Sequence, residues 1–177
     1  FGDESFLGFL SEQFLIHGIS PAMICLEITE TSAIANLTSA MRFIADLRGL
    51  GCRFALDDFG SGMSSFGYLK HLPVDYLKID GSFVKDMLED RIDRAMVEMI
   101  HHIGKVMGKR TIAEFVESDG IIAALKTIGV DYAQGYGIAR PKPFDASTVL
   151  LGRVVTPAAE SADPWADLTR KLRRKAG

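Results

Sequence analysis

The sequence predicts an α/β fold built on parallel strands, and two observations carry this prediction. Short strand-like runs alternate five times with segments of helical periodicity along the chain. Each strand-like run is almost wholly apolar, as expected for a strand whose two faces are both covered. A doubly wound open sheet and a closed (β/α)8 barrel both fit this alternation, so the periodicity leaves the two open.

The predicted elements follow one another in a regular order. Strands are expected at residues 23–28, 53–56, 76–79, 110–113 and 131–134. Helices are expected at 5–17, from a cap on Thr38 or Ser39 onward, at 66–72, at 92–103 and at 121–128. Gly18 and Pro73 follow two of these helices and explain why they end there.

Composition limits the class of protein. The chain has 177 residues, 47% of them hydrophobic, which is enough for one sizeable core and predicts a single domain. A formal net charge of −3 provides no broad basic surface, so we expect no nucleic acid polymer as a partner. No apolar run approaches the roughly 18 residues of a membrane span.

The two cysteines indicate the compartment. Cys25 and Cys52 lie inside apolar runs, and we expect both to be small buried core residues. They form no disulfide framework, which favours a reducing compartment. The sequence therefore predicts a cytoplasmic protein or the cytoplasmic part of a membrane-anchored one.

Polar side chains recur where the predicted strands end. They flank or follow all five strands, as Glu27 and Glu30, Asp57 and Asp58, Lys78 and Asp80, Glu114 and Glu117, and Gln134. In parallel α/β folds these strand ends meet on one face, which carries the function. The charges of Glu27 and Lys78 lie within apolar strands, where burial without a partner is costly. We therefore predict one functional face.

Simpler roles are open to some of these residues. An acidic residue after a strand often caps the next helix, and Glu30 and Glu117 fit that interpretation. Lys78 can serve only to neutralise Asp57 or Asp58. Capping alone does not explain polar groups at five successive strand ends.

The residue types on this face point to a divalent metal and a phosphate ester. Carboxylates brought close together repel one another, and oxygen-only ligands favour Mg²⁺ or Mn²⁺. Asp57 and Asp58 can share the ligation of a metal pair, which activates a water for in-line phosphoryl displacement. Lys78 can orient this water, help to deprotonate it, or offset charge in the transition state. This chemistry names no substrate.

Five segments in this order resemble a known family. They are LEITE at 26–30, ALDDFGSGMSSF at 55–66, LPVDYLKIDGSFV at 72–84, AEFVE at 113–117 and QGYGIARP at 134–141. Together they closely resemble the EAL domains, the cyclic di-GMP phosphodiesterases of bacterial signalling. The likeness covers about residues 1–146, and the resemblance implies a TIM-like (β/α)8 barrel with one antiparallel strand.

The resemblance also implies a role for each matching residue. Glu27, Asp57 and Asp58 would ligate Mg²⁺ or Mn²⁺, in a site for two metal ions. The catalytic residues would be Lys78 at the water, Glu114 at the metal site or as general base, and Gln134 beside the metal and water network. Glu30 would hold the loop after Asp57, and Asp80 and Glu117 would support the site from behind. Arg140 and Pro141 would lie near the guanine-binding rim.

The sequence departs from the family in two ways. Phe115 replaces the glycine of the more common AEGVE, which places a large side chain beside Glu114. The EAL tripeptide and the Asn-bearing strand motif that follows it are absent. Because a (β/α)8 barrel takes roughly 250 residues, we expect an N-terminally truncated domain at 1–150 with about five C-terminal β/α units. Residues 151–177 are predicted to be a linker and a short basic helix or tail.

Three hypotheses for the function follow. The first is an enzyme that opens cyclic di-GMP to linear pGpG with a metal-activated water. The second is a binding module, an inactive receptor for the same dinucleotide. The third is that this piece is inactive alone and folds poorly. The resemblance further implies a homodimer through the region after Asp57 and Asp58, and fusion to upstream sensor or diguanylate cyclase-type domains.

Overall fold

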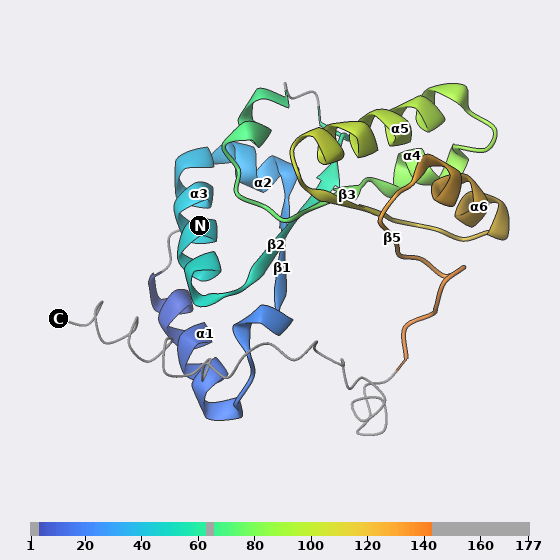
Figure 1. Cartoon of the computed structure of the whole chain (residues 1–177). Helices are drawn as coiled ribbons and strands as arrows, with labels where there is room; N and C mark the ends of the chain where they lie inside the picture. The colour runs from blue at the N-terminus through green and yellow to red at the C-terminus, as the bar shows by residue number, and fades with distance from the viewer. Residues whose placement is uncertain (1–3, 63–65, 143–177) are drawn as a thin grey trace. The chain divides into compact units, whose positions relative to one another are not determined.

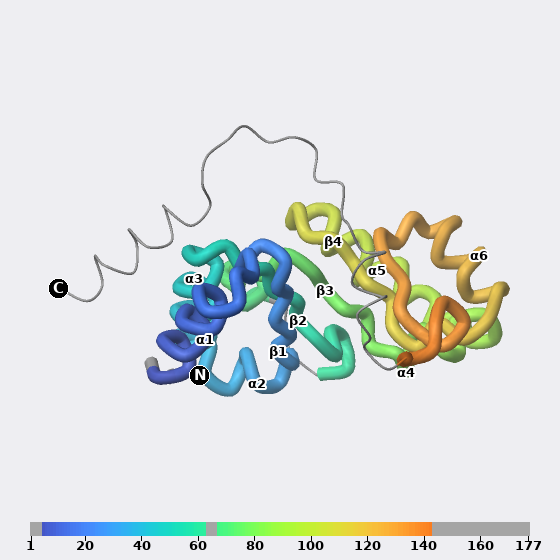
Figure 2. The backbone as a smooth tube through the Cα atoms, turned by 90° about the horizontal axis from the view of Figure 1, so that it is seen from below, coloured from blue at the N-terminus to red at the C-terminus, as the bar shows by residue number. Residues whose placement is uncertain are grey.

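The sheet of this protein has five parallel strands. The computed structural model describes residues 4–62 and 66–142 (Figures 1 and 2). The strands are β1 (Cys25–Thr29), β2 (Arg53–Phe59), β3 (Tyr76–Ile79), β4 (Arg110–Ala113) and β5 (Tyr132–Ala133). All four pairings between neighbouring strands are parallel.

The strand order decides between the two folds that the sequence left open. The order in the sheet is β1-β2-β3-β4-β5, the same as along the chain. Each crossover therefore advances in one direction, and right-handed crossovers then place the helices on one face of the sheet. A doubly wound sheet needs a reversal of the order, which is absent from the described strands. The sheet is a segment of a barrel.

Helices alternate with the strands as predicted. The described elements are α1 (Glu4–His17), η1 (Pro21–Met23), α2 (Glu30–Ala35), α3 (Leu37–Leu50), η2 (Phe66–Lys70), α4 (Gly81–Asp86), α5 (Arg91–Val106) and α6 (Asp119–Ile128). Side-chain oxygens of Asn36, Asp80, Asp90 and Ser118 accept backbone N–H groups at the starts of α3, α4, α5 and α6. These bonds satisfy donors that a helix start leaves free.

The core lies between the sheet and its helices. Phe54, Leu56 and Leu77 of the strands are fully buried, as are Ile44 of α3 and Ile100 of α5. Burial of each such side chain contributes about 1.5–3 kcal/mol. This close packing fixes the middle of the sheet, and it thereby fixes the positions of the strand ends.

Several sequence-based expectations were wrong in detail. The cap of α3 is Asn36 instead of Thr38 or Ser39, because α2 ends just before it and the chain turns directly from one helix into the next. The predicted helix at 66–72 is a shorter 3-10 helix. Cys52 is buried, but Cys25 is exposed, because β1 is an edge strand of the described sheet and lacks a neighbour on one side.

Residues from Arg140 onward form a unit separate from 1–139. Of that unit the structure describes only 140–142, where all three side chains are exposed. The predicted boundary at residue 150 and the basic tail over 151–177 lie outside the described residues. Within the described ranges, no helix has the length and apolar character needed to cross a bilayer.

Candidate metal-binding active site

The carboxyl end of β2 places two neighbouring acidic side chains together. In a regular strand, successive side chains point to opposite faces. Asp58 has φ 54°, a left-handed backbone, and the β2–β3 register shifts between Leu56 and Phe59. This irregularity breaks the alternation. The Asp58 backbone N–H donates to Asp57 Oδ1 at 3.1 Å, which fixes the Asp57 carboxylate beside it.

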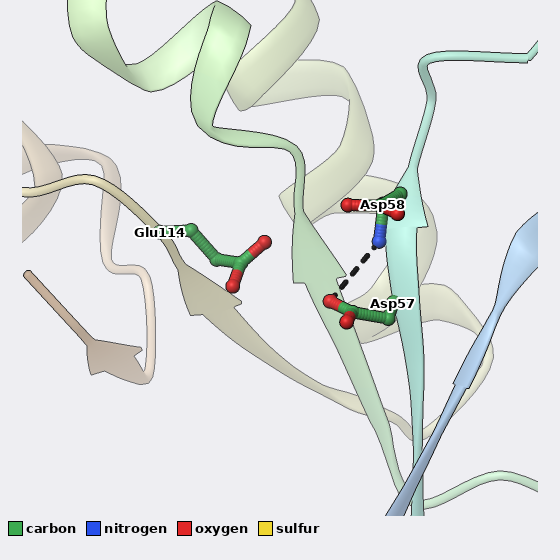
Figure 3. Close-up of side chains that lie close together, drawn as sticks. All are labelled: Asp57, Asp58 and Glu114. Atoms are coloured by element: carbon green, nitrogen blue, oxygen red, sulfur yellow. Dashed lines mark hydrogen bonds between the residues drawn. The ribbon is translucent and has the colours of Figure 1, made fainter.

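Glu114 completes a cluster of three carboxylates. It follows β4, and its side chain points across β3 toward Asp57 and Asp58 (Figure 3). One carboxylate oxygen from each of the three residues lies within 4.8 Å of the others. Asp57 and Glu114 are partly buried, and Asp58 is exposed. The sheet therefore gathers these acidic groups from two strands at one edge.

Lys78 lies between the two aspartates of β2 and Glu114, which follows β4. It belongs to β3, the strand between β2 and β4. Its Nζ lies 2.8 Å from Asp57 Oδ1, 2.8 Å from Glu114 Oε1 and 3.0 Å from Glu27 Oε2. Lys78 is 3% exposed, so a buried ammonium is satisfied by three acceptors from three other segments.

These contacts set the protonation of the site. Burial opposes the charge of Lys78, but hydrogen bonds to Asp57, Glu114 and Glu27 outweigh it and raise the pKa above its ordinary value. Burial raises the pKa of Glu114, and the hydrogen bond from Lys78 opposes that shift. Burial, followed by repulsion from Asp57 and Asp80, raises the pKa of Asp58. The lysine is therefore cationic at neutral pH, and two of the carboxylates carry unfavourable negative charge.

The cluster fits a divalent cation of the hard, oxygen-preferring kind. All three converging donors are carboxylate oxygens, the ligands that Mg²⁺ and Mn²⁺ prefer. Burial is the main cause of the raised pKa of Asp58 and of Glu114, and neighbouring carboxylates add to it; a bound cation would offset this negative charge.

Glu27 reaches the site from the adjacent strand. Glu27 is paired in register with Ala55, which lies two residues before Asp57 on β2. The Glu27 side chain therefore leaves the sheet farther from the strand ends than the Asp57 side chain does. The side chain is half exposed and pairs with Lys78. It stands outside the trio whose oxygens converge, and the structure brings it to the lysine.

Glu30 joins the strand end of β1 to the loop after β2. It is 2% exposed, and its Oε2 accepts the Gly60 N–H at 3.0 Å. Its Oε1 accepts the Tyr68 hydroxyl at 2.5 Å. The cap of α2 is Thr29, whose side chain accepts from Ser32, so capping is not the role of Glu30. Sequence reasoning missed Tyr68, because a single aromatic residue in a short 3-10 helix carries no periodic signal.

The remaining predicted residues lie around this centre. Asp80 follows Lys78 and caps α4 through a 2.8 Å bond from the Ser82 N–H. Glu117 is exposed beyond β4. Gln134 follows β5, where its backbone pairs with Ala113 and Val116 while its side chain is exposed.

Arg140 and Pro141 are exposed and belong to the unit that begins at Arg140. Among the residues of 4–62 and 66–142, the lysine and the carboxylates around it come from β1, β2, β3 and the position just after β4.

The fold and the site define a barrel-type α/β chain with a carboxylate cluster around a buried lysine at its strand ends. The EAL domain profile matches residues 1–141 of the 177. The chain belongs to the EAL domain family, which confirms the resemblance found in the sequence. "Cyclic di-GMP phosphodiesterase PdeB" of Shewanella oneidensis is 51% identical over 143 residues, covering 81% of this chain and 17% of that protein.

Solved structures agree with the fold. "PaMucR Phosphodiesterase, c-di-GMP complex" is 30% identical with a TM-score of 0.77, covering 84% of this chain and 59% of that one. The FimX EAL domain from Pseudomonas aeruginosa bound to c-di-GMP is 32% identical with a TM-score of 0.74, covering 78% and 57%. The chain therefore spans less than two thirds of these structures and under a fifth of the curated relative.

Proposed function

We propose that the protein containing this chain hydrolyses cyclic di-GMP to linear pGpG. The observation that carries the proposal is the convergence of Asp57, Asp58 and Glu114 beside the buried Lys78. The name of the Shewanella relative and the ligand in the two solved structures support the choice of substrate.

The metal ligands in this proposal are Asp57, Asp58 and Glu27, with Glu114 at the same centre. The ions are Mg²⁺ or Mn²⁺, and two adjacent aspartates suit a pair of them. When bound, such cations lower the pKa of water and offset negative charge on the phosphoryl oxygens. The residues of the chain position that water and hold the protons.

Lys78 acts as a fixed cation in this proposal. Because its pKa is raised, it does not take a proton from water at neutral pH. It donates hydrogen bonds instead, orienting the water and stabilising the charge that develops on the phosphorane-like transition state. Glu114, whose pKa is raised by burial, is suited to accept the proton of the attacking water.

The reaction balances without a further reactant. The water oxygen forms a bond to phosphorus while the bond from phosphorus to the 3′ oxygen breaks. The water loses one proton and the leaving 3′ oxygen gains one, so the ring opens to a chain with a free 5′ phosphate. Gln134 would support the water network, and Arg140 and Pro141 would contact a guanine at the rim. Glu30, Asp80 and Glu117 would keep the loops in place.

The partners and compartment belong to the same proposal. A second copy of the chain would pack through the region after Asp58. An upstream sensor or diguanylate cyclase-type domain would control turnover, and the protein would act in the cytoplasm. Sedimentation of the full-length protein checks the first of these, because a monomer at micromolar concentration contradicts it.

The test is a turnover assay on the full-length protein. Cyclic di-GMP is supplied with Mg²⁺ or Mn²⁺, and linear product is separated by chromatography. Glu114→Gln is expected to lose most of the activity, and Glu89→Gln, an exposed site on the α4–α5 connection, serves as the matched control. A protein that binds the dinucleotide and never cleaves it would be a receptor, and the enzymatic proposal would be wrong.

A further inference from the structure

A groove of about 380 Å³ lies between α5 and α6. Its lining includes Arg94, Glu98, His101, His102 and Lys105 of α5, and Thr127 of α6. None of these residues belongs to the carboxylate cluster around Lys78. Because most of these side chains are ionisable, the groove suits a charged occupant better than an apolar one.

One polar side chain at this groove is almost fully buried. His101 is 5% exposed, and its Nδ1 lies 2.8 Å from Thr111 Oγ1. The single hydrogen of the Thr111 hydroxyl is donated to Asp131 Oδ2 at 3.1 Å, so toward His101 this oxygen can only accept. The ring hydrogen of neutral His101 is therefore on Nδ1, and Nε2 carries a lone pair.

The Nε2 atom of His101 faces the groove. A Cβ added to Gly129 would lie 3.7 Å from this nitrogen, so Nε2 is directed toward the end of α6, where Thr127 lines the groove. Within the described ranges, this nitrogen forms no hydrogen bond, and no buried side-chain nitrogen is enclosed without one. Nε2 is therefore open to the groove and available to a molecule that enters it.

The charges on the groove side of His101 are positive. Lys105 follows His101 by four residues and His102 by three, so the three side chains occupy neighbouring positions on α5. Burial lowers the pKa of His101, Asp131 opposes the shift, and Lys105 and His102 add to it. Asp131 acts on the Nδ1 side, through Thr111. The excess of positive charge is therefore on the open side of the ring.

The other walls of the groove add little charge. Arg94 Nε lies 3.0 Å from Glu98 Oε1, so these two residues form a neutral pair about one turn before His101. The Thr127 hydroxyl donates to a carbonyl of its own helix. The carbonyl end of α6 disfavours an anion by about two- to five-fold in affinity, whereas one charge-assisted hydrogen bond favours it by roughly ten-fold or more. The Lys105 end of the groove therefore favours an anion.

We propose that the groove between α5 and α6 binds a small tetrahedral oxyanion of the phosphate class, and that His101 takes up a proton from solvent when the anion binds. The anion accepts hydrogen bonds from the Lys105 ammonium, from a ring N–H of His102 and from Nε2–H of protonated His101. Nδ1–H stays with Thr111, so protonation leaves the buried link intact. The volume of about 380 Å³ suits a free anion or a small phosphate monoester.

The experiment follows anion binding at the groove itself. Full-length protein with ¹³C-labelled histidine is titrated at constant ionic strength, and the dissociation constant is taken from the histidine ring resonances. Sulfate is the probe for the pH dependence, because it does not titrate near neutral pH. Inorganic phosphate and glycerol 3-phosphate then distinguish the two sources of the anion. Tighter binding of the second supports a monoester, and equal binding supports the free anion.

Four variants separate the site from the general charge of α5. Lys105→Gln, His101→Gln and His102→Gln each remove one group of the site. Arg91→Gln is the control, because it removes one positive charge at an exposed residue of α5 outside the groove lining. Thermal melting shows that each variant is folded, and Lys105→Gln decides the question even if His101→Gln is unstable, because Lys105 is exposed.

We expect Kd for sulfate to rise roughly ten-fold in Lys105→Gln and to stay within about two-fold of the wild-type value in Arg91→Gln. In wild type, Kd should fall as the pH drops below neutral, by up to about ten-fold per pH unit, because the bound anion and the His101 proton stabilise each other. His101→Gln should lose most of this pH dependence, whereas His102→Gln should keep it.

Three results would overturn the proposal. Equal Kd values for Lys105→Gln and Arg91→Gln would show that sulfate responds only to the overall charge. A wild-type Kd that does not change with pH would remove the coupled protonation of His101. Histidine resonances that move with Zn²⁺ and not with sulfate would show that the groove is a metal site instead. None of these measurements depends on hydrolysis of cyclic di-GMP, so the enzymatic proposal is tested separately.

Discussion

At the residue scale, the charge of Lys78 sets how the site can work. Three carboxylates from β1, β2 and the end of β4 surround its ammonium within 3.0 Å. These contacts raise the pKa of Lys78, so the side chain stays protonated. It therefore cannot accept a proton as a base, but it can donate hydrogen bonds. Glu114, which is partly buried and has a raised pKa, is the group suited to accept a proton.

Replacing Lys78 with methionine tests this division of roles. Lys78→Met keeps the length of the side chain and removes the charge, so we expect kcat to fall about 10²–10³-fold, as for loss of one transition-state donor. The initial rate of cyclic di-GMP hydrolysis by the full-length protein is the measurement. Lys126→Met, at an exposed lysine of α6, is the control and should keep wild-type kcat. Equal rates for the two variants would contradict the role.

The substitution Asp58→Asn is predicted to lower activity without lowering stability. Asn tolerates the left-handed backbone that Asp58 adopts, and Asp58→Asn removes repulsion with Asp57 and Asp80. We expect the free energy of unfolding to stay equal or rise by up to about 1 kcal/mol, while kcat falls at least about 100-fold. Urea denaturation and turnover are measured on the same preparation. A strongly destabilised variant would show that the carboxylate has a structural role.

At the element scale, short contacts fix how neighbouring elements meet. Glu30, in the first turn of α2, holds both the loop after β2 and the 3-10 helix η2 through Gly60 and Tyr68. Farther along the sheet, His101 of α5 is tied to β4. Its Nδ1 lies 2.8 Å from Thr111 Oγ1, and the Thr111 hydroxyl donates to Asp131 Oδ2 at 3.1 Å. Each of these groups joins elements that the sheet alone would leave loosely connected.

The Glu30 link predicts a graded effect on stability. Tyr68→Phe removes one bond and should cost about 1–2 kcal/mol, and Glu30→Ala removes both and should cost more. Because the loop that follows Asp58 is attached to Glu30, turnover should fall with stability in Glu30→Ala. Chemical denaturation gives the ranking, with Lys70→Ala, at an exposed residue of η2, as the neutral comparison. A Tyr68→Phe variant as stable as Lys70→Ala would count against the link.

The His101 link predicts a pH dependence. Burial lowers the pKa of His101 below its ordinary value of 6.5, with Asp131 opposing the shift and Lys105 and His102 adding to it. The unfolded chain then binds a proton at a higher pH than the folded one. The free energy of unfolding is thus expected to fall as pH drops from 6.5 toward the lowered pKa, by up to about 1.4 kcal/mol per pH unit.

The measurement is urea unfolding at a series of pH values for wild type and His101→Gln. The difference between the two curves isolates the histidine, since every other titrating group is shared. A constant difference across this window would mean that His101 keeps its ordinary pKa in the folded protein.

At the scale of the whole molecule, the sheet concentrates negative charge at one edge. Asp57, Asp58 and Glu114 belong to elements separated by more than fifty residues of sequence, and parallel pairing of β2, β3 and β4 brings them together. Any ligand that relieves this repulsion binds the folded state and not the unfolded chain. Metal binding at this edge would therefore raise the global stability.

Divalent metal should accordingly raise the melting temperature of the full-length protein. At a concentration of Mn²⁺ about 100 times Kd, linkage predicts a gain of about 2.7 kcal/mol. Calorimetry with Mn²⁺ and with a chelator gives the shift, and Asp58→Asn should abolish most of it. An identical shift in that variant would place the metal elsewhere.

Much of the fold was predictable because its signals are local. Residues 76–79 and 110–113 were predicted as strands and are β3 and β4 without change, since each is a short run that begins just after a helix-ending residue, Pro73 or Gly108. The small helices α2 and α4 were missed, because six residues are too few to show periodicity. The site residues Asp57, Asp58 and Glu114 were predicted from their positions at strand ends.

The sequence by itself determined the alternation of strands and helices, the family, and the acidic residues at the strand ends. Only the tertiary structure decided the unreversed strand order, the left-handed backbone of Asp58, and the position of Lys78 among three carboxylates. The physical reason is the separation along the sequence of the residues that interact. Periodicity and motifs report what each segment does locally, whereas charge state and ligand geometry depend on which segments the sheet brings within a few ångströms.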